Sequence, residues 1–379
     1  MQIAQLNVPD DVIDLGIGQP GSDVLPLELL QQASHHALEN SPRDILQYGA
    51  DAGDDYFKNA LATFLTGYYG EKVTPESLLT TNGISQVLGM ICTLFTKPGD
   101  AIIVEEPTYF LALNIFADHD LKIVSVPVDG DGLIVEELES LLKQHNPKFI
   151  YTIPTFQNPS GVTLSLERRE RLLELAEKYN VLVVADEVYH LLSYTTTPPK
   201  PMGCFDSEYV LSLGSFSKIL APGLRLGWVQ TSETLRQRLE SYGVIASGGG
   251  LNPFTSAIVR SALELGLQDR YLTHLKRLYS ERSRVLVTAL CEDFPNHEVD
   301  DVQGGYFIWL KLPGTDTSEL LKRAKLNKVA FQAGVKFSGQ GNLHNYLRLC
   351  FAFYDEGRLR EGVKRLVEVI KPWPVACGL

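Results

Sequence analysis

The chain has 379 residues, of which 44% are hydrophobic and 21% are charged, as in an ordinary globular protein with a large core. Its formal net charge of -12 disfavours a nucleic-acid partner, because binding to phosphates requires clustered lysine and arginine. The sequence shows neither a long apolar run nor a basic amino-terminal leader, so we expect no membrane association and a cytoplasmic location. Five scattered cysteines without a CxxC pair indicate neither a metal site nor a disulfide framework.

The first motif along the chain, Gly16-Ile-Gly-Gln-Pro-Gly21, matches the GxGxxG form of dinucleotide-binding loops. That fingerprint requires a buried strand, a tight turn and an immediate helix. Here Pro20 interrupts the motif, no clear buried strand precedes it, and the next helix is predicted near Pro26. We therefore expect no dinucleotide site at these glycines.

The middle of the chain alternates short apolar runs with amphipathic stretches. The spacing predicts a helix over 167–179, with Ser165 as its N-cap. Buried strands are predicted at 101–105, 149–153, 181–185 and 210–213. Strands that alternate with helices predict an α/β fold whose large domain has three layers, with a mostly parallel central sheet between helices.

The last third of the chain has a different pattern. Long helices are predicted over 269–290 and 357–370, and strands over 306–310 and 346–351. This pattern predicts a smaller α+β domain. We expect a large domain at 45–265 and a discontinuous small domain made of 1–44 and 266–379.

The most informative segment is Ser215-Phe-Ser217-Lys218-Ile-Leu-Ala-Pro-Gly-Leu-Arg225, which follows a predicted buried strand. A single lysine is most often a solvated surface charge. This lysine lies just past a strand end, which is a site-forming position in α/β folds. The nearby hydroxyls and guanidinium suit a phosphate, and the amine suits an imine with an aldehyde. The segment therefore predicts a cofactor that carries both groups.

Two other predicted strands also end in polar residues that suit this chemistry. One leads to Asn158, and the next leads to Asp186 and Tyr189. Carboxyl ends of neighbouring parallel strands converge, so we expect these side chains to share a crevice with Lys218. A buried Asp186 would keep a pyridine nitrogen protonated, while the amide and the phenol would donate to a ring oxygen.

A helix start is expected to complete the phosphate site. In Thr-Thr-Asn-Gly83-Ile84-Ser85, the glycine permits close backbone approach, and the next two amides open a helix. Tyr109 follows a strand end and would offer a flat face to a ring.

Each of these residues also has an ordinary explanation. Asp186 could cap a helix, Asn158-Pro-Ser-Gly161 could be only a turn, and Ser85 could be a plain helix-start hydroxyl. Tyr109 and Tyr189 could be ordinary half-buried aromatics. Five such coincidences in the right order around a strand-end lysine favour a cofactor site.

These motifs resemble those of the fold-type-I pyridoxal-phosphate aminotransferases of classes I and II. The resemblance extends from Ile13-Asp-Leu-Gly-Ile-Gly-Gln-Pro20 to the final helix. It implies pyridoxal 5'-phosphate as the cofactor and a homodimer with active sites at the interface. The implied cofactor contacts are Lys218 as the imine lysine, Asp186 at the pyridine nitrogen, Asn158 and Tyr189 at the ring oxygen, Tyr109 stacked on the ring, and Ser215, Ser217 and Arg225 at the phosphate.

Three further assignments come from the resemblance alone. Arg348 looks like the arginine that binds the α-carboxylate of the substrate, a role that suits the paired donors of guanidinium. Gly18 resembles the glycine that lines the substrate pocket, which Asn158 would also line. Tyr48 resembles the tyrosine that reaches the phosphate bound by the neighbouring subunit.

The implied reaction transfers the α-amino group of an amino acid to a 2-oxo acid, with Lys218 as general base and acid. Two alternatives stay open: lyase or synthase chemistry on the same scaffold, and the effector-binding module of a transcription regulator. The early start of the scaffold and the acidic charge argue against the regulator.

The substrate side chain is the least determined feature. The lysine motif resembles that of the 2-aminoadipate, kynurenine and aromatic aminotransferase branch. Residues 1–42 contain no lysine or arginine, which disfavours a distal carboxylate bound by an amino-terminal arginine. We therefore expect a neutral side chain, apolar or aromatic. Gly248-Gly-Gly250 is expected to form either a flexible loop near the site, which we favour, or a linker that ends a helix. We expect His190 to pack rather than react.

Overall fold

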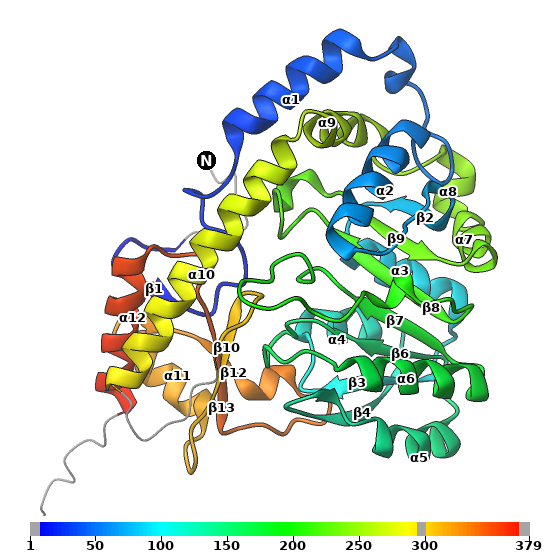
Figure 1. The fold of residues 1–379 in the computed structure, drawn as a ribbon. Coiled ribbons are helices and arrows are strands. Elements are labelled where there is room, and N and C mark those ends of the chain that lie inside the picture. Colours follow the sequence, from blue (N-terminus) through cyan, green and yellow to red (C-terminus); the bar gives the residue numbers. More distant parts are fainter. Residues whose placement is uncertain (1–7, 294–300, 371–379) are drawn as a thin grey trace, which may run out of the picture.

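The computed structural model of the chain describes residues 8–293 and 301–370. One region is built on an eight-stranded sheet covered by helices, and the other is built on a small sheet with two long helices beside it (Figure 1). This architecture confirms the predicted α/β class, with a three-layer large domain and a smaller α+β domain. Within the two described ranges, no helix is long and apolar enough to cross a membrane.

The large sheet contains every strand that was predicted in the middle of the chain. Its strands are β2 (Leu78–Thr81), β3 (Ala101–Glu106), β4 (Lys122–Asp129), β5 (Gly132–Leu133), β6 (Phe149–Thr152), β7 (Leu182–Asp186), β8 (Val210–Ser215) and β9 (Gly227–Thr231). Their spatial order is β2-β9-β8-β7-β6-β3-β4-β5. The pairs from β8 to β4 are parallel, whereas β9 runs antiparallel to both of its neighbours. The three strands β6, β7 and β8 are therefore adjacent and parallel.

Alternation along the strands divides the core between the two faces of this sheet. On β3, Ile102 and Val104 pack in the cluster that holds residues of α3 (Ile84–Phe95) and α4 (Phe110–Asp118). Ile103 packs instead with α5 (Val135–His145) and α6 (Leu166–Tyr179). Because each such side chain contributes about 1.5–3 kcal/mol when fully buried, a one-residue slip of register would be costly. The register fixes where each strand ends, and so where its polar residues lie.

The predicted capping of α6 is confirmed. Ser165 Oγ accepts a hydrogen bond from the Arg168 amide at 3.3 Å, and Asn180 ends the helix in the left-handed region at φ 50°. Serine at an N-cap satisfies an amide that the helix itself cannot.

The smaller region holds the carboxyl-terminal third of the chain. Its elements are α10 (Leu267–Asp293), β10 (Phe307–Lys311), α11 (Thr317–Leu326), β11 (Val329–Ala330), β12 (Gln332–Ala333), β13 (Tyr346–Cys350) and α12 (Glu356–Ile370). The antiparallel sheet has the order β10-β13-β12, and α10 packs against α12. The ends of the two predicted strands agree with the observed ends within one residue. The ends of the two predicted long helices agree within three residues.

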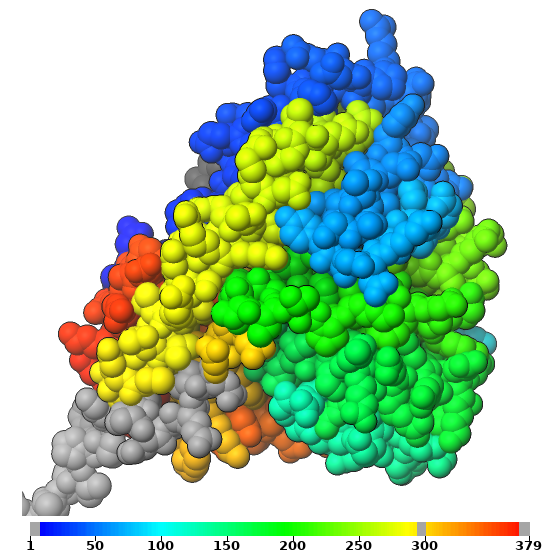
Figure 2. All heavy atoms as spheres, viewed as in Figure 1, coloured from blue at the N-terminus to red at the C-terminus, as the bar shows by residue number. Residues whose placement is uncertain are grey.

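The amino-terminal segment contacts both regions. Its strand β1 (Ile13–Asp14) pairs with β11, while α1 (Leu27–Asn40) packs along α9 (Pro253–Glu264) (Figures 1 and 2). The Arg260 guanidinium of α9 donates to Ser41 Oγ at 2.8 Å. We keep the division into 45–265 and 1–44 with 266–379 as a proposal.

The remaining elements connect these parts. The helices are α2 (Asp55–Tyr69), α7 (Glu233–Glu240) and α8 (Gly243–Gly248), and the 3-10 turns are η1 (Arg43–Leu46), η2 (Pro75–Ser77), η3 (Met202–Cys204), η4 (Pro222–Leu224) and η5 (Gly334–Phe337). The favoured loop at 248–250 is instead the end of α8 followed by a bridge, which agrees with the alternative of a helix-ending linker. Gly250 pairs with Gly49 and donates its amide to the Gly49 carbonyl at 2.9 Å.

Candidate active site

The carboxyl ends of β6, β7 and β8 bring the central predicted residues to one edge of the sheet. Asp186 is the last residue of β7, Lys218 follows β8 by three residues, and Asn158 lies in the loop after β6. Lys218 Nζ donates to the Gly18 carbonyl at 3.0 Å, so the amino-terminal segment also reaches this edge.

Asp186 is a buried carboxylate with only one of its two oxygens hydrogen-bonded. Its Oδ2 accepts from the Tyr151 hydroxyl at 2.8 Å, while its Oδ1 has no hydrogen-bond partner. Burial raises the pKa of Asp186 to about 6, although the Tyr151 hydrogen bond, the nearby Val188 amide and the Lys218 ammonium oppose that rise. A buried acceptor without a partner is costly, so this oxygen is suited to a cationic donor.

The Lys218 side chain is half-buried at this edge of the sheet. Burial lowers the pKa of Lys218 to about 8, an effect that the Arg348 charge strengthens and Asp186 weakens. Its Nζ lies 5.6 Å from the centroid of the Tyr306 ring, whose hydroxyl donates to the Lys218 carbonyl at 2.9 Å. About a tenth of such an amine is neutral at pH 7, against a negligible fraction for an exposed lysine.

Arg348, on β13, is fully enclosed beside the same edge. Its two terminal nitrogens donate to Asn158 Oδ1 at 2.9 Å and to the Gly16 carbonyl at 2.6 Å. The guanidinium lies 4.1 Å from the centroid of the Phe307 ring. A Cβ on Gly18 would lie 3.3 Å from both this ring and Arg348 Nη2, so a larger residue there would crowd the guanidinium.

The two predicted tyrosines lie close to these charges, Tyr189 buried and Tyr109 half-buried. Burial raises the pKa of Tyr109 to about 12, and the Asp186 charge adds to the rise. Burial also raises the pKa of Tyr189, whose ring packs edge-on against Tyr306 and Phe307. Both phenols therefore stay protonated and can donate hydrogen bonds.

The hydroxyls at the end of β8 form a small turn. Ser215 Oγ donates to Ser217 Oγ at 3.0 Å and accepts from the Ser217 amide at 3.1 Å. Arg225 has φ 48° and an exposed side chain, and its Nη2 donates to the Asn82 carbonyl at 3.3 Å. A Cβ on Gly83 would lie only 3.1 Å from that Nη2, so the guanidinium of the lysine motif reaches the start of α3.

The start of α3 leaves its first amides without a side-chain cap. Gly83 is the N-cap residue, with φ 85°, and no side chain accepts from the first turn. Ile84 and Ser85 open the helix, and Ser85 is exposed. An uncapped helix start with a guanidinium beside it is suited to bind an anion.

Tyr48 differs from the other predicted residues because its side chain is 85% exposed. The bridge between Gly49 and Gly250 fixes the backbone next to it. A Cβ on Gly249 would lie 3.2 Å from the Tyr48 Cβ, and φ at Gly249 is 77°. The tyrosine is thus held on the surface of one chain rather than in the crevice.

Several residues at the site were not predicted. Tyr151, inside β6, donates a hydrogen bond to Asp186. The sequence offered one sign of this contact, because a phenol inside an apolar strand needs a hydrogen-bond partner when it is buried. Phe307 lies against Arg348, and Tyr306 lies against Lys218. The contact of Arg348 with the Gly16 carbonyl could not be predicted from the sequence, because every residue has a backbone carbonyl.

His190 packs as expected. Burial lowers its pKa to about 3, and its Nδ1 lies 3.2 Å from Thr155 Oγ1. A buried neutral imidazole with a hydroxyl partner is a structural feature of the segment that follows Tyr189.

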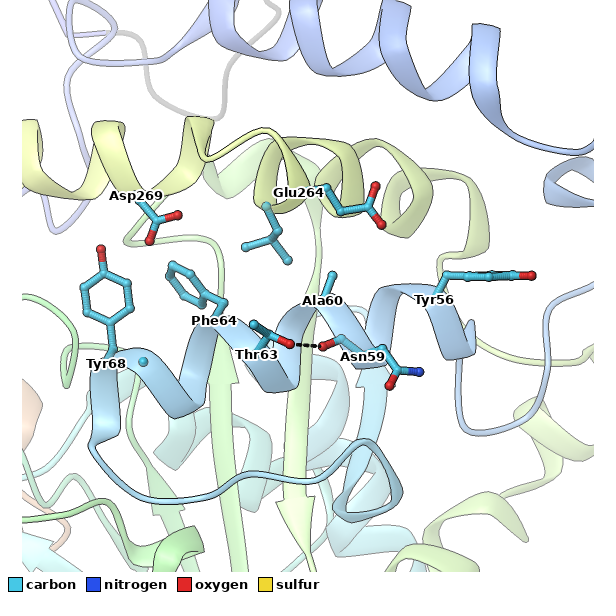
Figure 3. Close-up of a pocket in the computed structure, with 10 residues that line it drawn as sticks. Tyr56, Asn59, Ala60, Thr63, Phe64, Tyr68, Glu264 and Asp269 are labelled. Atoms are coloured by element: carbon cyan, nitrogen blue, oxygen red, sulfur yellow. Dashed lines mark hydrogen bonds between the residues drawn. The ribbon is translucent and has the colours of Figure 1, made fainter.

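A separate groove of about 710 Å³ lies between α2 and the junction of α9 and α10 (Figure 3). Its rings already face the chain's own cations: Lys276 Nζ lies 5.3 Å from the Tyr68 ring, and the Arg260 guanidinium lies 5.5 Å from the Tyr56 ring. The described residues that line the groove include no predicted site residue, and the candidate site is the group of residues at the carboxyl ends of β6, β7 and β8.

The sequence matches the family described as aminotransferase class I and II over residues 10–366, and the chain belongs to this family. The predicted family and activity are confirmed: the protein is an aminotransferase.

Individual relatives share most of the chain. It is 36% identical to aromatic-amino-acid aminotransferase 1 of Thermococcus litoralis, over 98% of this chain and 90% of that protein. A kynurenine aminotransferase structure from Pyrococcus horikoshii matches with a TM-score of 0.89 and 34% identity, covering 96% of this chain and 91% of that one. The α-aminoadipate aminotransferase of Thermus thermophilus, solved with N-(5'-phosphopyridoxyl)-L-leucine, matches with a TM-score of 0.86 and 28% identity over 96% and 92%.

Proposed function

We propose that the chain binds pyridoxal 5'-phosphate in the crevice around Lys218 and moves the α-amino group of an amino acid to a 2-oxo acid. The observation that carries this proposal is the buried Asp186 carboxylate. One of its oxygens has no hydrogen-bond partner, and the nearby Lys218 charge lowers its pKa. When bound, this cofactor supplies an aldehyde for the lysine amine and a pyridinium ring that withdraws electrons. A relative that binds a phosphopyridoxyl group supports the same cofactor.

The ring end of the proposed site consists of Asn158, Asp186, Tyr189 and Lys218. The unpartnered Asp186 oxygen would accept from the pyridine N–H and keep that nitrogen protonated through charge pairing. Asn158 and the protonated Tyr189 would donate to the ring oxygen, and Tyr109 would stack on the ring.

The phosphate end consists of Gly83, Ser215, Ser217 and Arg225, with the amides of Ile84 and Ser85. It offers hydroxyls, a guanidinium and an uncapped helix start, the three kinds of donor that bind a phosphate. The exposed Arg225 supports entry of the phosphate from solvent.

Lys218 is the proposed proton carrier. Because burial lowers its pKa to about 8, part of the amine is neutral near neutral pH and can take a proton from the α-carbon of the substrate. The Gly18 carbonyl orients the Nζ, and the Tyr306 hydroxyl anchors the lysine backbone.

Arg348 is the proposed partner of the substrate α-carboxylate, in a pocket that Gly18 and Asn158 also line. Its guanidinium is buried among the rings of Phe307 and Phe337, at 4.1 and 5.0 Å from their centroids. An apolar wall next to the carboxylate site supports a substrate with a neutral, apolar or aromatic side chain. The names of the aromatic and kynurenine relatives point the same way.

We further propose a homodimer and a cytoplasmic location. The exposed Tyr48, whose neighbouring backbone is fixed by the bridge to Gly250, would reach the phosphate end of the partner subunit. The cysteines of the described ranges are free thiols, which supports a reducing compartment.

Replacement of Lys218 tests the proposal. We expect Lys218→Ala to abolish the visible absorbance band of the bound cofactor and to lower turnover by about 10²- to 10⁴-fold. Lys276→Ala is the matched control, because burial also lowers the pKa of Lys276 but the residue lies outside the crevice. A Lys218→Ala enzyme that keeps the band and full turnover would refute the assignment.

A donor screen tests the substrate class. Single amino acids are mixed with the holoenzyme, and bleaching of the visible band is followed without an acceptor. We expect aromatic and large apolar amino acids to bleach it faster than aspartate or 2-aminoadipate. The reverse order would overturn the neutral side chain without affecting the cofactor assignment.

A further inference from the structure

Gln157 is a buried side chain whose hydrogen-bonding capacity is fully used. Its Nε2 donates to Glu105 Oε2 at 2.9 Å and to the Pro107 carbonyl at 2.6 Å. Its Oε1 accepts from the amide and the hydroxyl of Ser160, at 2.9 and 2.6 Å. A primary amide has two donors and two acceptor sites, and all four are occupied here. The side chain therefore has one orientation.

Glu105 is the other half of this bridge. It lies on β3, is 2% exposed, and accepts from the Thr152 hydroxyl and the Ile153 amide as well as from Gln157. An ionised carboxylate can only accept hydrogen bonds, and each of these three groups has a hydrogen to donate. The bridge thus joins the end of β3 to the end of β6 and to the loop that follows.

The residues next to the bridge belong to the proposed site. Asn158 follows Gln157 directly, and its Oδ1 accepts from Arg348 at 2.9 Å. Backbone bonds close the loop around it, from the Gly161 amide to the Gln157 carbonyl at 2.7 Å and from the Gln157 amide to the Val162 carbonyl at 2.9 Å. The position of Asn158 is therefore set on one side by Gln157 and on the other by Arg348.

We propose that Glu105 and Gln157 are positioning residues, which hold Asn158 where it can serve both the cofactor ring and the carboxylate-binding Arg348. Neither residue touches the reacting atoms. If the bridge is lost, the loop can shift. Asn158 then loses its contacts to the cofactor ring and to Arg348 at the same time. This inference rests on the proposed function of the site.

The test uses two variants and a matched control in the holoenzyme. Gln157→Leu removes all four hydrogen bonds, and Glu105→Leu keeps the approximate size of the side chain but leaves the three donors without their acceptor. The control is Gln230→Leu: Gln230 is 4% exposed and donates to the Gly203 carbonyl at 2.8 Å, outside the crevice. Measured quantities are KM for the amino donor, the pH midpoint of the visible cofactor band, the cofactor Kd and Tm.

We expect both site variants to raise KM by about tenfold to a hundredfold, because small misplacements of a bound substrate have effects of this size. The midpoint of the band should move by about one pH unit in the same variants. The cofactor Kd should stay within about threefold, since the phosphate end is untouched. Gln230→Leu should lower Tm without changing KM or the midpoint.

A change in Tm alone, with KM and the midpoint as in the wild type, would overturn the proposal and leave the bridge a feature of stability. The same result would follow if KM rose in one variant while the midpoint stayed fixed in both. A wild-type protein without a visible band would instead refute the proposed function, so the two failures are distinguishable.

Discussion

The ring end and the phosphate end of the proposed site are built by different means. At the ring end, Asp186 and Arg348 are buried and joined to Tyr151, Asn158 and Gly16 by hydrogen bonds. At the phosphate end, the donors are backbone amides, short hydroxyl side chains and an arginine that faces solvent. One end has side chains held in place by their neighbours, and the other has groups that stay accessible.

This difference separates two tasks. A buried, constrained carboxylate keeps its effect on pKa values because water cannot screen it, so the ring end should control the chemical step. Accessible donors can meet a phosphate that arrives from solvent, so the phosphate end should control how firmly the cofactor is held. Variants at the two ends should therefore change different constants.

The largest effect is expected at the ring end. Asp186→Asn keeps the shape of the side chain and the Tyr151 contact but removes the negative charge. We expect kcat to fall by about 10²- to 10³-fold, the usual effect of removing one electrostatic stabiliser. Single-turnover kinetics at saturating cofactor measure it. If kcat were unchanged while only the cofactor Kd rose, the separation of tasks would be wrong.

The complementary change is Arg225→Ala at the phosphate end. We expect the cofactor Kd to rise by about tenfold to a hundredfold, because hydrogen bonds to charged groups contribute about 1.5–3 kcal/mol. At saturating cofactor, kcat should stay within about threefold of the wild type. Fluorescence titration of the cofactor-free protein gives Kd, and a fall in kcat comparable to that of Asp186→Asn would contradict the comparison.

The pKa of Lys218 can be measured through the rate of cofactor incorporation. The neutral amine is the reactive form, and burial lowers its pKa to about 8, so the rate should rise as pH increases through this value. Between about pH 7 and pH 9 the neutral fraction grows about tenfold and then levels off. Asp186→Asn should shift the midpoint downwards, because the charge that favours the ammonium is gone. If the rate still rises about tenfold per pH unit above about pH 9, the pKa of Lys218 is that of an ordinary exposed lysine.

The smallest effect is expected for Tyr48→Phe, which removes one hydroxyl from the proposed partner contact. We expect the cofactor Kd to rise by about twofold to tenfold, because a neutral hydrogen bond contributes about 0.5–1.5 kcal/mol. Sedimentation velocity should show a dimer for the wild type and for Tyr48→Phe. A fully active monomer would contradict the proposed contact of Tyr48 with the phosphate end of the partner subunit.

Sequence reasoning could reach the features that depend on strand order and local spacing. The alternation of strands and helices predicted the sheet, and the rule that parallel strand ends converge placed Asn158, Asp186 and Lys218 at one edge. The strand β9 was not predicted, although Leu224, Leu226 and Trp228 alternate with other residues after the Pro222-Gly223 turn. Its antiparallel direction depends on tertiary pairing with β2 and β8, which no local pattern encodes.

The contacts that hold the site residues in place were harder to infer. Tyr151 and Glu105 lie inside strands, and which side chains they meet depends on the register between β3, β6 and β7. The carbonyls of Gly16 and Gly18 come from the far end of the chain. Pairings of this kind follow from how the two regions are packed, so residue type and spacing alone could not identify them.

Those two carbonyls have a practical consequence for where the chain can be cut. Gly16 and Gly18 accept from Arg348 and Lys218, which lie 332 and 200 positions later in the sequence. A deletion that removes the segment through Gly18 would leave every residue of the lysine motif intact, yet it would strip both cations of their backbone acceptors and remove the partner of β11. For protein engineering, residues 13–18 should therefore be kept together with the proposed active site.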